Sequence, residues 1–354
     1  MKVKSLEIQN FRNISNISLE FDDEINVICG ENAQGKTNII EALWLFSGAK
    51  SFRNSKDNEF IKFGETNAKI SVDFQMLGVD NQARITFCEK KIAYLNEKKL
   101  PNTSSLAGKY NAIIFSPSDL TLVTDGPDKR RRFLDVAIGQ LYPNYIEILR
   151  NYTRAVMQRN KIIKDYRYDK TISIMLDIFE TEIVDMGNKI INYRKIYIDI
   201  LNKYVSKIYS GISCGKEDIK IFYISKSGEN LDLQKLKNSR EIDMFTSTTS
   251  VGPHRDDISF TINEISARSF GSQGQKRSVA LSLKLAGAEV IKEVSGEYPI
   301  CLLDDVMSEL DENRQNYILN HIRNWQSFIT CCDTSNIKNL KEGKVITIRN
   351  GGVS

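Results

Sequence analysis

One segment of eight residues constrains the fold of this chain more than any other feature. Residues 30–37 read Gly-Glu-Asn-Ala-Gln-Gly-Lys-Thr and directly follow a short apolar run at residues 25–29. The two glycines allow the backbone to turn tightly, so that its N–H groups point toward one centre. Such a loop joins a buried strand to a helix, and apolar residues recur at helical spacing over residues 39–46. The segment therefore predicts an α/β fold.

The same loop predicts binding of ATP and Mg²⁺. Its backbone N–H groups and the positive end of the following helix attract phosphate oxygens. Lys36 is expected to reach the β and γ phosphates, and Thr37 is expected to offer its hydroxyl to Mg²⁺. The residues expected to contact the nucleotide include the whole loop: Gly30, Glu31, Asn32, Ala33, Gln34, Gly35, Lys36 and Thr37.

Two acidic residues follow an apolar run near the end of the sequence. Residues 299–303 read Pro-Ile-Cys-Leu-Leu and predict a buried strand, and Asp304 and Asp305 come directly after it. Such a strand delivers carboxylates beside a phosphate loop. We expect Asp304 to hold Mg²⁺, directly or through water, and Asp305 to orient the attacking water or accept its proton. Lys36 and Asp305 are therefore the predicted catalytic residues.

A second glycine-containing turn opens a helix at residues 270–277, which read Phe-Gly-Ser-Gln-Gly-Gln-Lys-Arg. Small residues at a helix start expose backbone N–H groups, so the turn is a candidate second anion site. Its expected ligands are Ser272, Gly274 and Gln275. A helix-capping turn without a ligand is the alternative, and it would be favoured if this segment stood alone.

The middle of the chain has a different pattern. Between Pro143 and Tyr209 there is no further proline, and Gly187 is the one internal glycine. Apolar residues recur there in steps of three and four, a period typical of helices that pack along a seam, with Arg159 as a polar break. A polar segment at residues 167–171 divides the run. We predict two antiparallel helices that form a protruding arm; two ordinary core helices of a bundle are the alternative.

Strands are expected on both sides of these helices, for example at residues 112–115 and 258–262. A hydrophobic share of 41% and a charged share of 27% are typical of a globular chain and exclude a disordered one. We therefore expect an ATPase head formed by residues 1–142 and 246–354, with residues 143–245 inserted as a mainly helical arm or second lobe.

Six cysteines occur without a Cys-x-x-Cys pair, and most lie in apolar runs, which favours buried reduced thiols over a metal site or disulfides. They are Cys29, Cys88, Cys214, Cys301, Cys331 and Cys332. The start of the sequence lacks the apolar stretch of a signal peptide, and no run approaches the ~18 uncharged apolar residues that a membrane span needs. We therefore expect a cytoplasmic protein without a membrane partner.

A net charge of +4 is too small to indicate a nucleic-acid binder by itself, so any polyanion site must come from local clusters. One cluster is the run Lys-Arg-Arg-Arg that begins at Lys129, in which Arg130, Arg131 and Arg132 are candidate DNA contacts. The run is either a solvated helix face or part of a phosphate-binding surface with Lys90, Lys91, Lys98 and Lys99.

The order of phosphate loop, serine-glycine turn and acidic strand resembles that of the ATP-binding-cassette (ABC) ATPases. Residues 271–275 stand where that family has Leu-Ser-Gly-Gly-Gln, its signature turn, and residues 308–311 follow the acidic strand as its D-loop does. The resemblance implies an ABC-type P-loop ATPase head. It also implies that two copies close around ATP, with Ser272 and Gly274 of one copy on the γ-phosphate bound by the other.

Further segments resemble the RecF family of DNA-repair ATPases over essentially the whole chain. The most specific are Gly-Pro-His-Arg-Asp-Asp at residues 252–257 and Ser-Gln-Gly-Gln-Lys-Arg at residues 272–277. The other segments are residues 10–13, 50–53, 115–120, 126–135 and 158–160. The resemblance adds Arg12 and Arg53 to the expected nucleotide contacts.

The RecF resemblance implies an ATP-gated homodimer that binds single- and double-stranded DNA at gaps or junctions, with weak, DNA-stimulated ATP hydrolysis. It also implies RecR as a partner and a role in loading RecA recombinase. Two other functions remain open. One is another short-armed, SMC-like ATPase that tethers DNA. The other is the ATPase subunit of a membrane transporter, which the helical arm and a missing histidine disfavour.

Three positions depart from the cassette pattern. Ser116 lies where that family has a glutamine after a strand, and Asp119 is expected to replace the glutamine near Mg²⁺. The family's histidine is missing near Cys332, and His321, one of two histidines in the chain, is expected on a helix surface. Asp305 replaces the usual glutamate, and this shorter carboxylate would fit slow hydrolysis.

Overall fold

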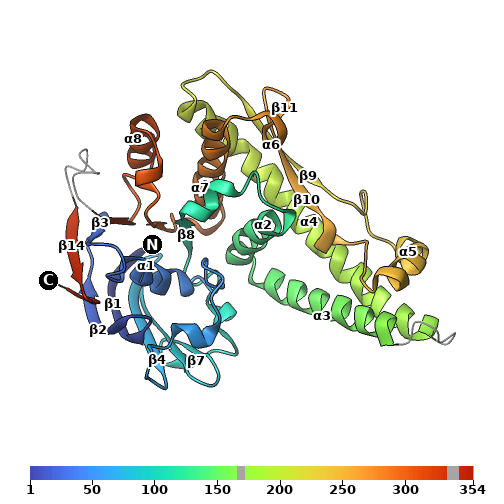
Figure 1. The fold of residues 1–354 in the computed structure, drawn as a ribbon, viewed down its shortest axis with the longest axis horizontal. Helices are drawn as coiled ribbons and strands as arrows, with labels where there is room; N and C mark the ends of the chain where they lie inside the picture. Colours follow the sequence, from blue (N-terminus) through green and yellow to red (C-terminus); the bar gives the residue numbers. More distant parts are fainter. Residues whose placement is uncertain (166–171, 333–342, 354) are drawn as a thin grey trace.

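Strands form one end of the molecule and long helices form the other (Figure 1). The computed structural model describes residues 1–165, 172–332 and 343–353. The strand-rich end holds two six-stranded sheets and both termini, and the helical end holds a three-stranded sheet. This arrangement agrees with the predicted α/β head that carries a helical arm.

The first six-stranded sheet is mostly parallel and carries the phosphate loop. Its order is β15-β14-β3-β13-β12-β8, and only β15 runs antiparallel to its neighbour. The strands are β3 (Ile25–Cys29), β8 (Ala112–Phe115), β12 (Ile300–Leu303), β13 (Ser327–Cys331), β14 (Lys344–Arg349) and β15 (Gly352–Val353). Strands β8, β12 and β13 are buried throughout, which explains their largely apolar runs. The carboxyl ends of the parallel strands meet at one edge.

The second six-stranded sheet is antiparallel, in the order β2-β1-β4-β5-β6-β7. Its strands are β1 (Lys2–Phe11), β2 (Ile14–Glu20), β4 (Ala68–Met76), β5 (Val79–Phe87), β6 (Ile92–Leu95) and β7 (Lys98–Lys99). Alternate residues of β4 are buried, so one face of this sheet packs on the core. Helix α1 (Lys36–Leu45) shares that core with both sheets, which unites Ile28 of β3, Leu43 of α1 and Val72 of β4. Because α1 is covered by both sheets, it is apolar on most sides.

Four long helices dominate the other end: α2 (Pro127–Leu141), α3 (Pro143–Asp165), α4 (Ile172–Ile212) and α7 (Gln273–Ser295). The three-stranded sheet has the order β11-β10-β9, with β9 (Ile219–Ile224), β10 (Asp257–Ile262) and β11 (Ile265–Ser266). The shorter helices are α5 (Leu233–Thr246), α6 (Ala267–Phe270) and α8 (Glu312–His321). The 3₁₀ helices are η1 (Asp57–Phe60), η2 (Thr103–Leu106), η3 (Pro117–Thr121), η4 (Pro253–Arg255) and η5 (Met307–Glu309).

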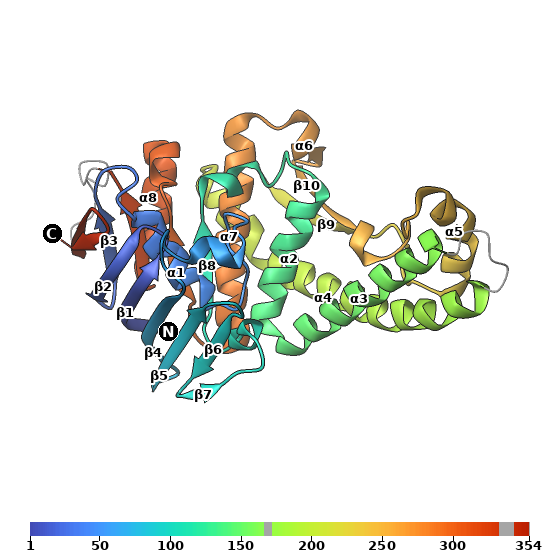
Figure 2. The same ribbon diagram turned by 60° about the horizontal axis from the view of Figure 1, so that its bottom comes forward.

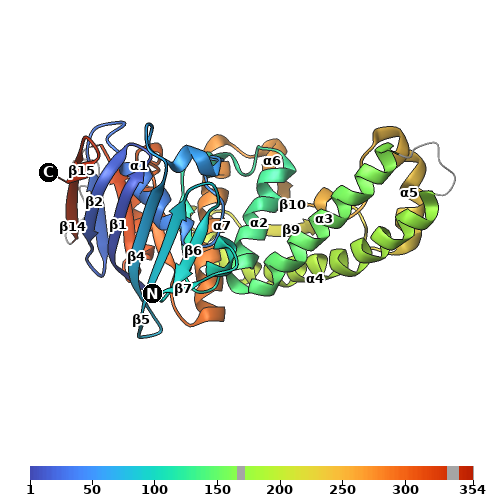
Figure 3. The same ribbon diagram turned by 90° about the horizontal axis from the view of Figure 1, so that it is seen from below.

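Helices α3 and α4 form the predicted arm (Figures 2 and 3). They lie side by side and extend away from the sheets, with α5 packed on them near the far end. The base of α4 packs instead against α7 and β9. The arm prediction is therefore confirmed. The alternative, ordinary core helices, holds only for the base of α4, which packs within the body of the molecule. The turn predicted at residues 167–171 lies outside the described residues, and the domain division at residues 143–245 stays a prediction.

The polar break at Arg159 belongs to a buried ion-pair network. Arg159 is fully buried, and its guanidinium lies 3.0 Å from Glu180 of α4 and 2.7 Å from Asp243 of α5. Arg240 adds a second ion pair to Glu180 at 2.6 Å. Removing one member of such a network leaves a buried charge unpaired, at a cost of about 3–5 kcal/mol. The network therefore fixes how α3, α4 and α5 pack.

The segment at residues 252–257 holds the arm against the rest of the helical end. The ring of His254 is hydrogen-bonded to Tyr152 Oη at 2.5 Å, and burial lowers the pKa of His254 to about 4, so that the ring is neutral. The carbonyl of Pro253 accepts a hydrogen bond from Arg194 at 2.7 Å. In this structure these two residues of the RecF-like segment are therefore packing residues.

Three of the six cysteines differ from the expectation of buried thiols. Cys301 and Cys331 are buried, but Cys88, Cys214 and Cys332 are exposed. Each of the exposed three lies just past the end of a strand or helix, where the apolar run stops. All six are free thiols.

His321 ends helix α8, as expected, but it is only partly exposed on the helix surface. Its side chain is about one-fifth exposed, lies 3.2 Å from Glu289 and packs edge-on against Trp325.

Among the described residues, no helix is long and apolar enough to cross a membrane. In the same part of the chain, no three His, Cys, Asp or Glu side chains are grouped as a metal ion would require.

Candidate nucleotide-binding site

The phosphate loop connects β3 to α1, as the sequence predicts. Gly30 and Gly35 have φ values of +156° and +113°, which residues with a Cβ rarely adopt. A Cβ on Gly30 would also lie 2.4 Å from the backbone oxygen of Ile348. Both glycines are therefore needed for the shape of the loop. Asn13 braces it from outside by donating a hydrogen bond to the carbonyl of Ala33 at 3.0 Å.

Lys36 is covered by the loop that precedes it. Its Nζ donates to the carbonyl oxygens of Gly30 at 2.6 Å and Glu31 at 2.9 Å, and the residue is 4% exposed. A third donation reaches the sulfur of Cys332 at 3.7 Å. The ammonium is thus held at the centre of the loop by carbonyls and a thiol. Since these partners are not carboxylates, the positive charge remains available to a phosphate.

Thr37 and Asp304 meet where the sequence predicts a Mg²⁺ site. Oγ1 of Thr37 donates to Oδ1 of Asp304 at 2.9 Å, although the two residues are 267 positions apart. They meet because β12 lies two strands from β3 in the same sheet, with β13 between them. A hydroxyl and a carboxylate are oxygen ligands that Mg²⁺ accepts, and this ion completes its shell with water and phosphate oxygens. The pair therefore fits Mg²⁺.

The carboxyl of Asp304 is in an unusual electrostatic setting. Burial raises its pKa to about 6, and the neighbouring Asp305 adds to the shift. A cation beside this carboxyl would reverse that trend, because an opposite charge favours the ionised form. Bound Mg²⁺ would therefore lower the pKa of Asp304 and favour its ionised form.

Thr330 of β13 connects the two acids and was missed by the sequence analysis. Its Oγ1 donates to Oδ1 of Asp304 at 3.1 Å and accepts from the backbone N–H of Asp305 at 2.8 Å. Asp305 itself has a φ of +50°, an uncommon value for a residue other than glycine. A polar residue inside a buried strand is the signal that could have identified Thr330.

Arg12 and Arg53 both approach Glu41, a fully buried acid of α1 that the sequence analysis did not single out. The guanidinium of Arg12 lies 2.9 Å from Glu41 and stacks over Phe60, with 4.9 Å to the ring centroid. Arg53 lies 3.8 Å from Glu41 and donates to Asn38 at 3.0 Å. The two arginines are therefore held beside the first turns of α1. Their contact with a nucleotide stays a prediction.

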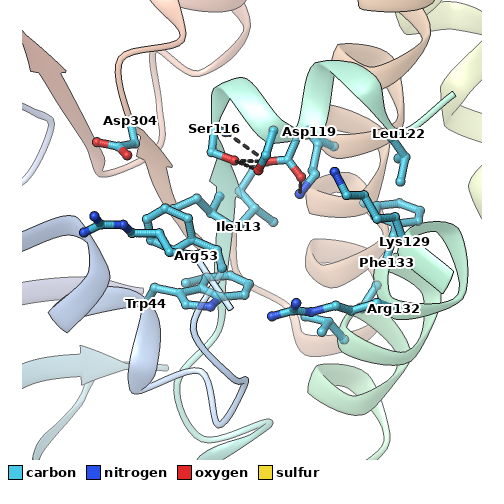
Figure 4. Close-up of a pocket in the computed structure, with 18 of the residues that line it drawn as sticks. Trp44, Arg53, Ile113, Ser116, Asp119, Leu122, Lys129, Arg132, Phe133 and Asp304 are labelled. Carbon is cyan, nitrogen blue, oxygen red and sulfur yellow. Dashed lines mark hydrogen bonds and ion pairs between the residues drawn. The ribbon is translucent and has the colours of Figure 1, made fainter. Parts of the chain in front are cut away.

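A cavity of about 520 Å³ opens beside this site, between the two ends of the molecule (Figure 4). Thr37 and Asp304 line one side of it. Asp119 also lines the cavity, but its carboxylate accepts from the backbone N–H of Ser116 at 2.9 Å and pairs with Lys284 at 2.8 Å. Asp119 thus caps its own turn and ties it to α7. Its role near Mg²⁺ stays a prediction.

The signature turn lies at the start of α7, in the helical end. Ser272 is exposed, its Oγ accepts from the N–H of Gln275 at 3.2 Å, and the Gln275 side chain accepts from the N–H of Ser272 at 2.7 Å. This reciprocal pair is a capping box. Arg314 donates to the carbonyl of Gly274 at 3.1 Å. The structure thus contains the helix cap that the sequence analysis kept as an alternative, and a contact of this turn with phosphate stays a prediction.

The basic run on α2 divides between core and surface. Arg130 is buried, and its guanidinium bonds both carboxylate oxygens of Asp257, at 2.6 Å and 2.9 Å. The prediction that Arg130 contacts DNA is therefore wrong, because its charge is satisfied inside the core. Arg131 donates to the carbonyl of Asp256 at 2.7 Å, and burial lowers the pKa of Arg132. These two lie nearer the surface.

The whole chain matches a known family. The family model for the RecF/RecN/SMC N-terminal domain covers residues 2–354. The DNA replication and repair protein RecF of Clostridium perfringens is 38% identical over 362 aligned positions, which cover 100% of this chain and 99% of that protein. The chain belongs to the RecF family. The RecF protein of Bacillus cytotoxicus is 39% identical over 367 positions, with coverage of 100% and 98%.

Solved structures agree with RecF membership. A structure of the recombination mediator protein RecF-ATP in the RecFOR pathway superimposes with a TM-score of 0.91 at 36% identity, over 100% of this chain and 97% of that one. A second RecF structure, with ATPrS, has a TM-score of 0.92 at 35% identity, over 99% and 97%. The Smc head of Pyrococcus furiosus shares the fold at 16% identity and a TM-score of 0.57. The predicted ABC-type ATPase fold is therefore confirmed, and the transporter alternative is set aside.

Proposed function

We propose that this chain is an ATP-dependent DNA-binding protein of recombinational repair. One observation carries the proposal: Thr37 and Asp304 touch beside the phosphate loop, with the ammonium of Lys36 at the loop's centre. That arrangement suits ATP with Mg²⁺. The match to a RecF-ATP structure over the whole chain supports the same cofactors.

The chain's own residues would divide the work at the nucleotide. Lys36 would leave the carbonyls of its loop for the β and γ phosphates, because charged acceptors bind an ammonium more strongly than neutral ones. Thr37 and Asp304 would hold Mg²⁺, which supplies positive charge to the phosphates when bound. Asp305 would orient the attacking water and accept its proton. A single short carboxylate in this role supports weak hydrolysis.

A second copy of the chain is proposed to complete the site. Ser272 is exposed at the start of α7. The capping box occupies the N–H groups of Ser272 and Gln275, so the intervening N–H groups of Gln273 and Gly274 are the ones proposed to face a γ-phosphate. A two-fold axis would place this turn over the nucleotide of the other copy, so that one patch is used twice. ADP lacks the γ-phosphate, and hydrolysis would therefore loosen the homodimer.

DNA is proposed to lie in a groove between α3 and the strand-rich end, which we call the basic groove. It has a volume of about 1350 Å³. The cationic residues that line it are Lys50, Lys56, Lys91, Arg131, Arg132, Arg150 and Arg154, and the acidic ones are Asp57, Asp128 and Asp135. Seven cations against three acids make this lining positive in a chain of small net charge. Contacts of this kind recognise phosphates in both single- and double-stranded DNA.

Charge removal in the basic groove tests this placement. Arg150→Ala with Arg154→Ala should weaken duplex binding and reduce the salt slope by about 0.9 for each DNA phosphate that the variant no longer neutralises. Lys203→Ala with Lys207→Ala removes the same charge from exposed positions of α4, outside the groove lining, and is the matched control. Equal effects of the two pairs in fluorescence anisotropy titrations at several salt concentrations would contradict the placement.

The proposed partners follow from the family match. A recombination mediator of the RecFOR pathway that matches the whole chain supports RecR and the RecA-loading machinery as partners. We also propose action at single-strand gaps or junctions, ATP hydrolysis that DNA stimulates, and a location in the cytoplasm.

Gel-shift titration of duplex DNA with and without ATP tests the proposed function. The account predicts much tighter binding with ATP, and loss of that gain in Lys36→Ala. Duplex binding of equal strength with and without ATP would contradict an ATP-gated DNA-binding protein.

A further inference from the structure

Three cysteines gather at the phosphate loop. Cys29 ends β3 and directly precedes Gly30, and Cys331 of β13 is paired with Cys29 across the parallel sheet. Cys332 follows, and its backbone oxygen lies 3.7 Å from the sulfur of Cys29. The proposed chemistry uses none of these thiols, so their position needs another account.

Cys332 differs from the other two in exposure and in what it touches. It is exposed, whereas Cys331 is buried and Cys29 is partly buried. Its sulfur accepts a hydrogen bond from Nζ of Lys36 at 3.7 Å and donates to Oδ1 of Asn32 at 3.0 Å. Burial raises the pKa of the Cys331 thiol to about 12, which makes that thiol a poor nucleophile. Cys332 is thus the thiol of this group that a dissolved reagent meets first.

We propose that Cys332 is a modification site at which small electrophiles and peroxides switch off nucleotide binding. The proposal rests on the ATP binding proposed above, because the modified sulfur would act through Lys36 and Asn32 of the phosphate loop. Modification of a thiol far from the phosphate loop would not disturb the residues that are proposed to bind the nucleotide, whereas modification of Cys332 would.

The covalent steps balance without any further reactant. With a maleimide, the thiol adds across the carbon–carbon double bond: a sulfur–carbon bond forms, and the thiol proton moves to the neighbouring carbon. With hydrogen peroxide, the sulfur attacks one oxygen, the oxygen–oxygen bond breaks, and water leaves with the thiol proton. The sulfur is oxidised by two electrons to a sulfenic acid, and the peroxide is reduced by two.

Each adduct adds atoms where phosphates must enter. The sulfur already touches Lys36 and Asn32, so a group bonded to it fills the space between them. A second peroxide would give a sulfinate, whose negative charge would pair with the ammonium and compete with phosphate for it. The bulkier maleimide adduct should therefore block the loop even without a charge.

Two other exposed cysteines provide an internal control. Cys88 follows β5 and donates to the carbonyl of Lys90 at 3.0 Å, within its own turn. Cys214 follows α4 at the helical end. Neither belongs to the strands that carry the phosphate loop, so their modification should leave ATP affinity unchanged.

The test treats the full chain with N-ethylmaleimide, measures ATP affinity by calorimetry and locates the label by peptide mass spectrometry. The wild type and the Cys88→Ser/Cys214→Ser variant should lose affinity by about tenfold to a hundredfold, the equivalent of one charge-assisted hydrogen bond. Cys332→Ser and Cys332→Ala, each compared with its own untreated sample, should change by less than about twofold. Saturating ATP should slow labelling of Cys332 but not of Cys88 or Cys214.

Two results would overturn the proposal: unchanged ATP affinity in wild-type protein fully labelled at Cys332, or equal loss of affinity in both Cys332 variants. Untreated wild type that binds no ATP would instead contradict the proposed function. Because that measurement precedes the reagent, the two failures are distinguishable.

Discussion

The phosphate loop and the signature turn both open a helix with small residues, but their surroundings differ. The phosphate loop follows a buried strand. Lys36 and Thr37 at the start of α1 meet Asp304, which follows β12 of the same sheet. The signature turn is exposed, and Ser272 bonds the start of its own helix. One turn is thus surrounded by the groups that a nucleotide needs, and the other has only a helix end.

This difference teaches that a helix N-terminus alone does not define a nucleotide site. The phosphate loop adds a cation and a metal-binding pair to the helix end, while the signature turn needs a ligand brought from elsewhere. A second copy of the chain is the proposed source of that ligand. The variants below alter the catalytic acid, the phosphate-loop site or the signature turn, one at a time.

Asp305→Asn should have the largest effect. We expect ATP hydrolysis to fall by about 10²–10⁴-fold, because the amide cannot accept the proton of the attacking water. ATP affinity should persist, since neither turn is altered, and ATP-driven dimers should last longer. Phosphate release and calorimetry on the same sample measure both quantities. Wild-type turnover in this variant would assign the catalytic base to another residue.

Lys36→Ala should weaken ATP binding at the phosphate loop and leave the signature turn unchanged. ATP affinity should fall by at least about a hundredfold, as expected for the loss of two charge-assisted hydrogen bonds. Calorimetry measures the affinity, and thermal melting checks that the fold persists. Lys50→Ala removes the same charge from the basic groove outside the loop and serves as the control. Unchanged affinity in Lys36→Ala would contradict the phosphate-loop assignment.

Asp304→Asn should remove a pH-dependent contribution to stability at the phosphate-loop site. The folded pKa of about 6 exceeds the ordinary value of 3.8, so the folded state binds this proton more tightly than the unfolded state. That contribution to stability is fully present below the unfolded pKa and is lost as pH rises through the folded pKa. Without Mg²⁺, the wild type should therefore lose about 1–3 kcal/mol of stability as the pH rises from about 4 to 7.

The asparagine variant should lack this pH dependence, because it keeps an acceptor oxygen for Thr37 but carries no charge. Thermal melts near pH 5 and pH 7.5 compare the two proteins, and added Mg²⁺ at the higher pH should raise the Tm of the wild type alone. If the Tm of the two proteins depends on pH in the same way, the carboxyl of Asp304 does not have a raised pKa in the folded state.

The sequence was sufficient for the parts of the site that local patterns encode. The phosphate loop depends on two glycines and their neighbours, and the run before Asp304 identifies a buried strand whose carboxyl end carries an acid. Parallel strands then bring Asp304 to Thr37, because every carboxyl end in such a sheet lies at one edge. The positions of the strands and of the first helix are therefore enough to predict that Asp304 and Thr37 lie close together.

Contacts between distant segments could not be predicted in the same way. Arg130 belongs to a run of four basic residues, a pattern typical of an exposed surface. It is nevertheless buried, because it forms an ion pair with Asp257, which lies 127 positions away in the sequence. Glu41 and Thr330 carry no motif and matter only through their neighbours across the fold. Arg159 interrupts an apolar seam, and its two acidic partners lie on other helices. Pairing of buried charges depends on tertiary packing, which composition and spacing do not contain.

Light scattering of wild type and Ser272→Arg with ATP, with ADP and without nucleotide tests the central claim most directly. The account predicts that the wild type forms dimers with ATP and not with ADP. It also predicts that Ser272→Arg binds ATP with nearly unchanged affinity but stays monomeric, because a bulky side chain at the exposed turn blocks the approach of the second copy. Dimers of equal strength in all three states would contradict the account, and so would a Ser272→Arg protein that still dimerises only with ATP.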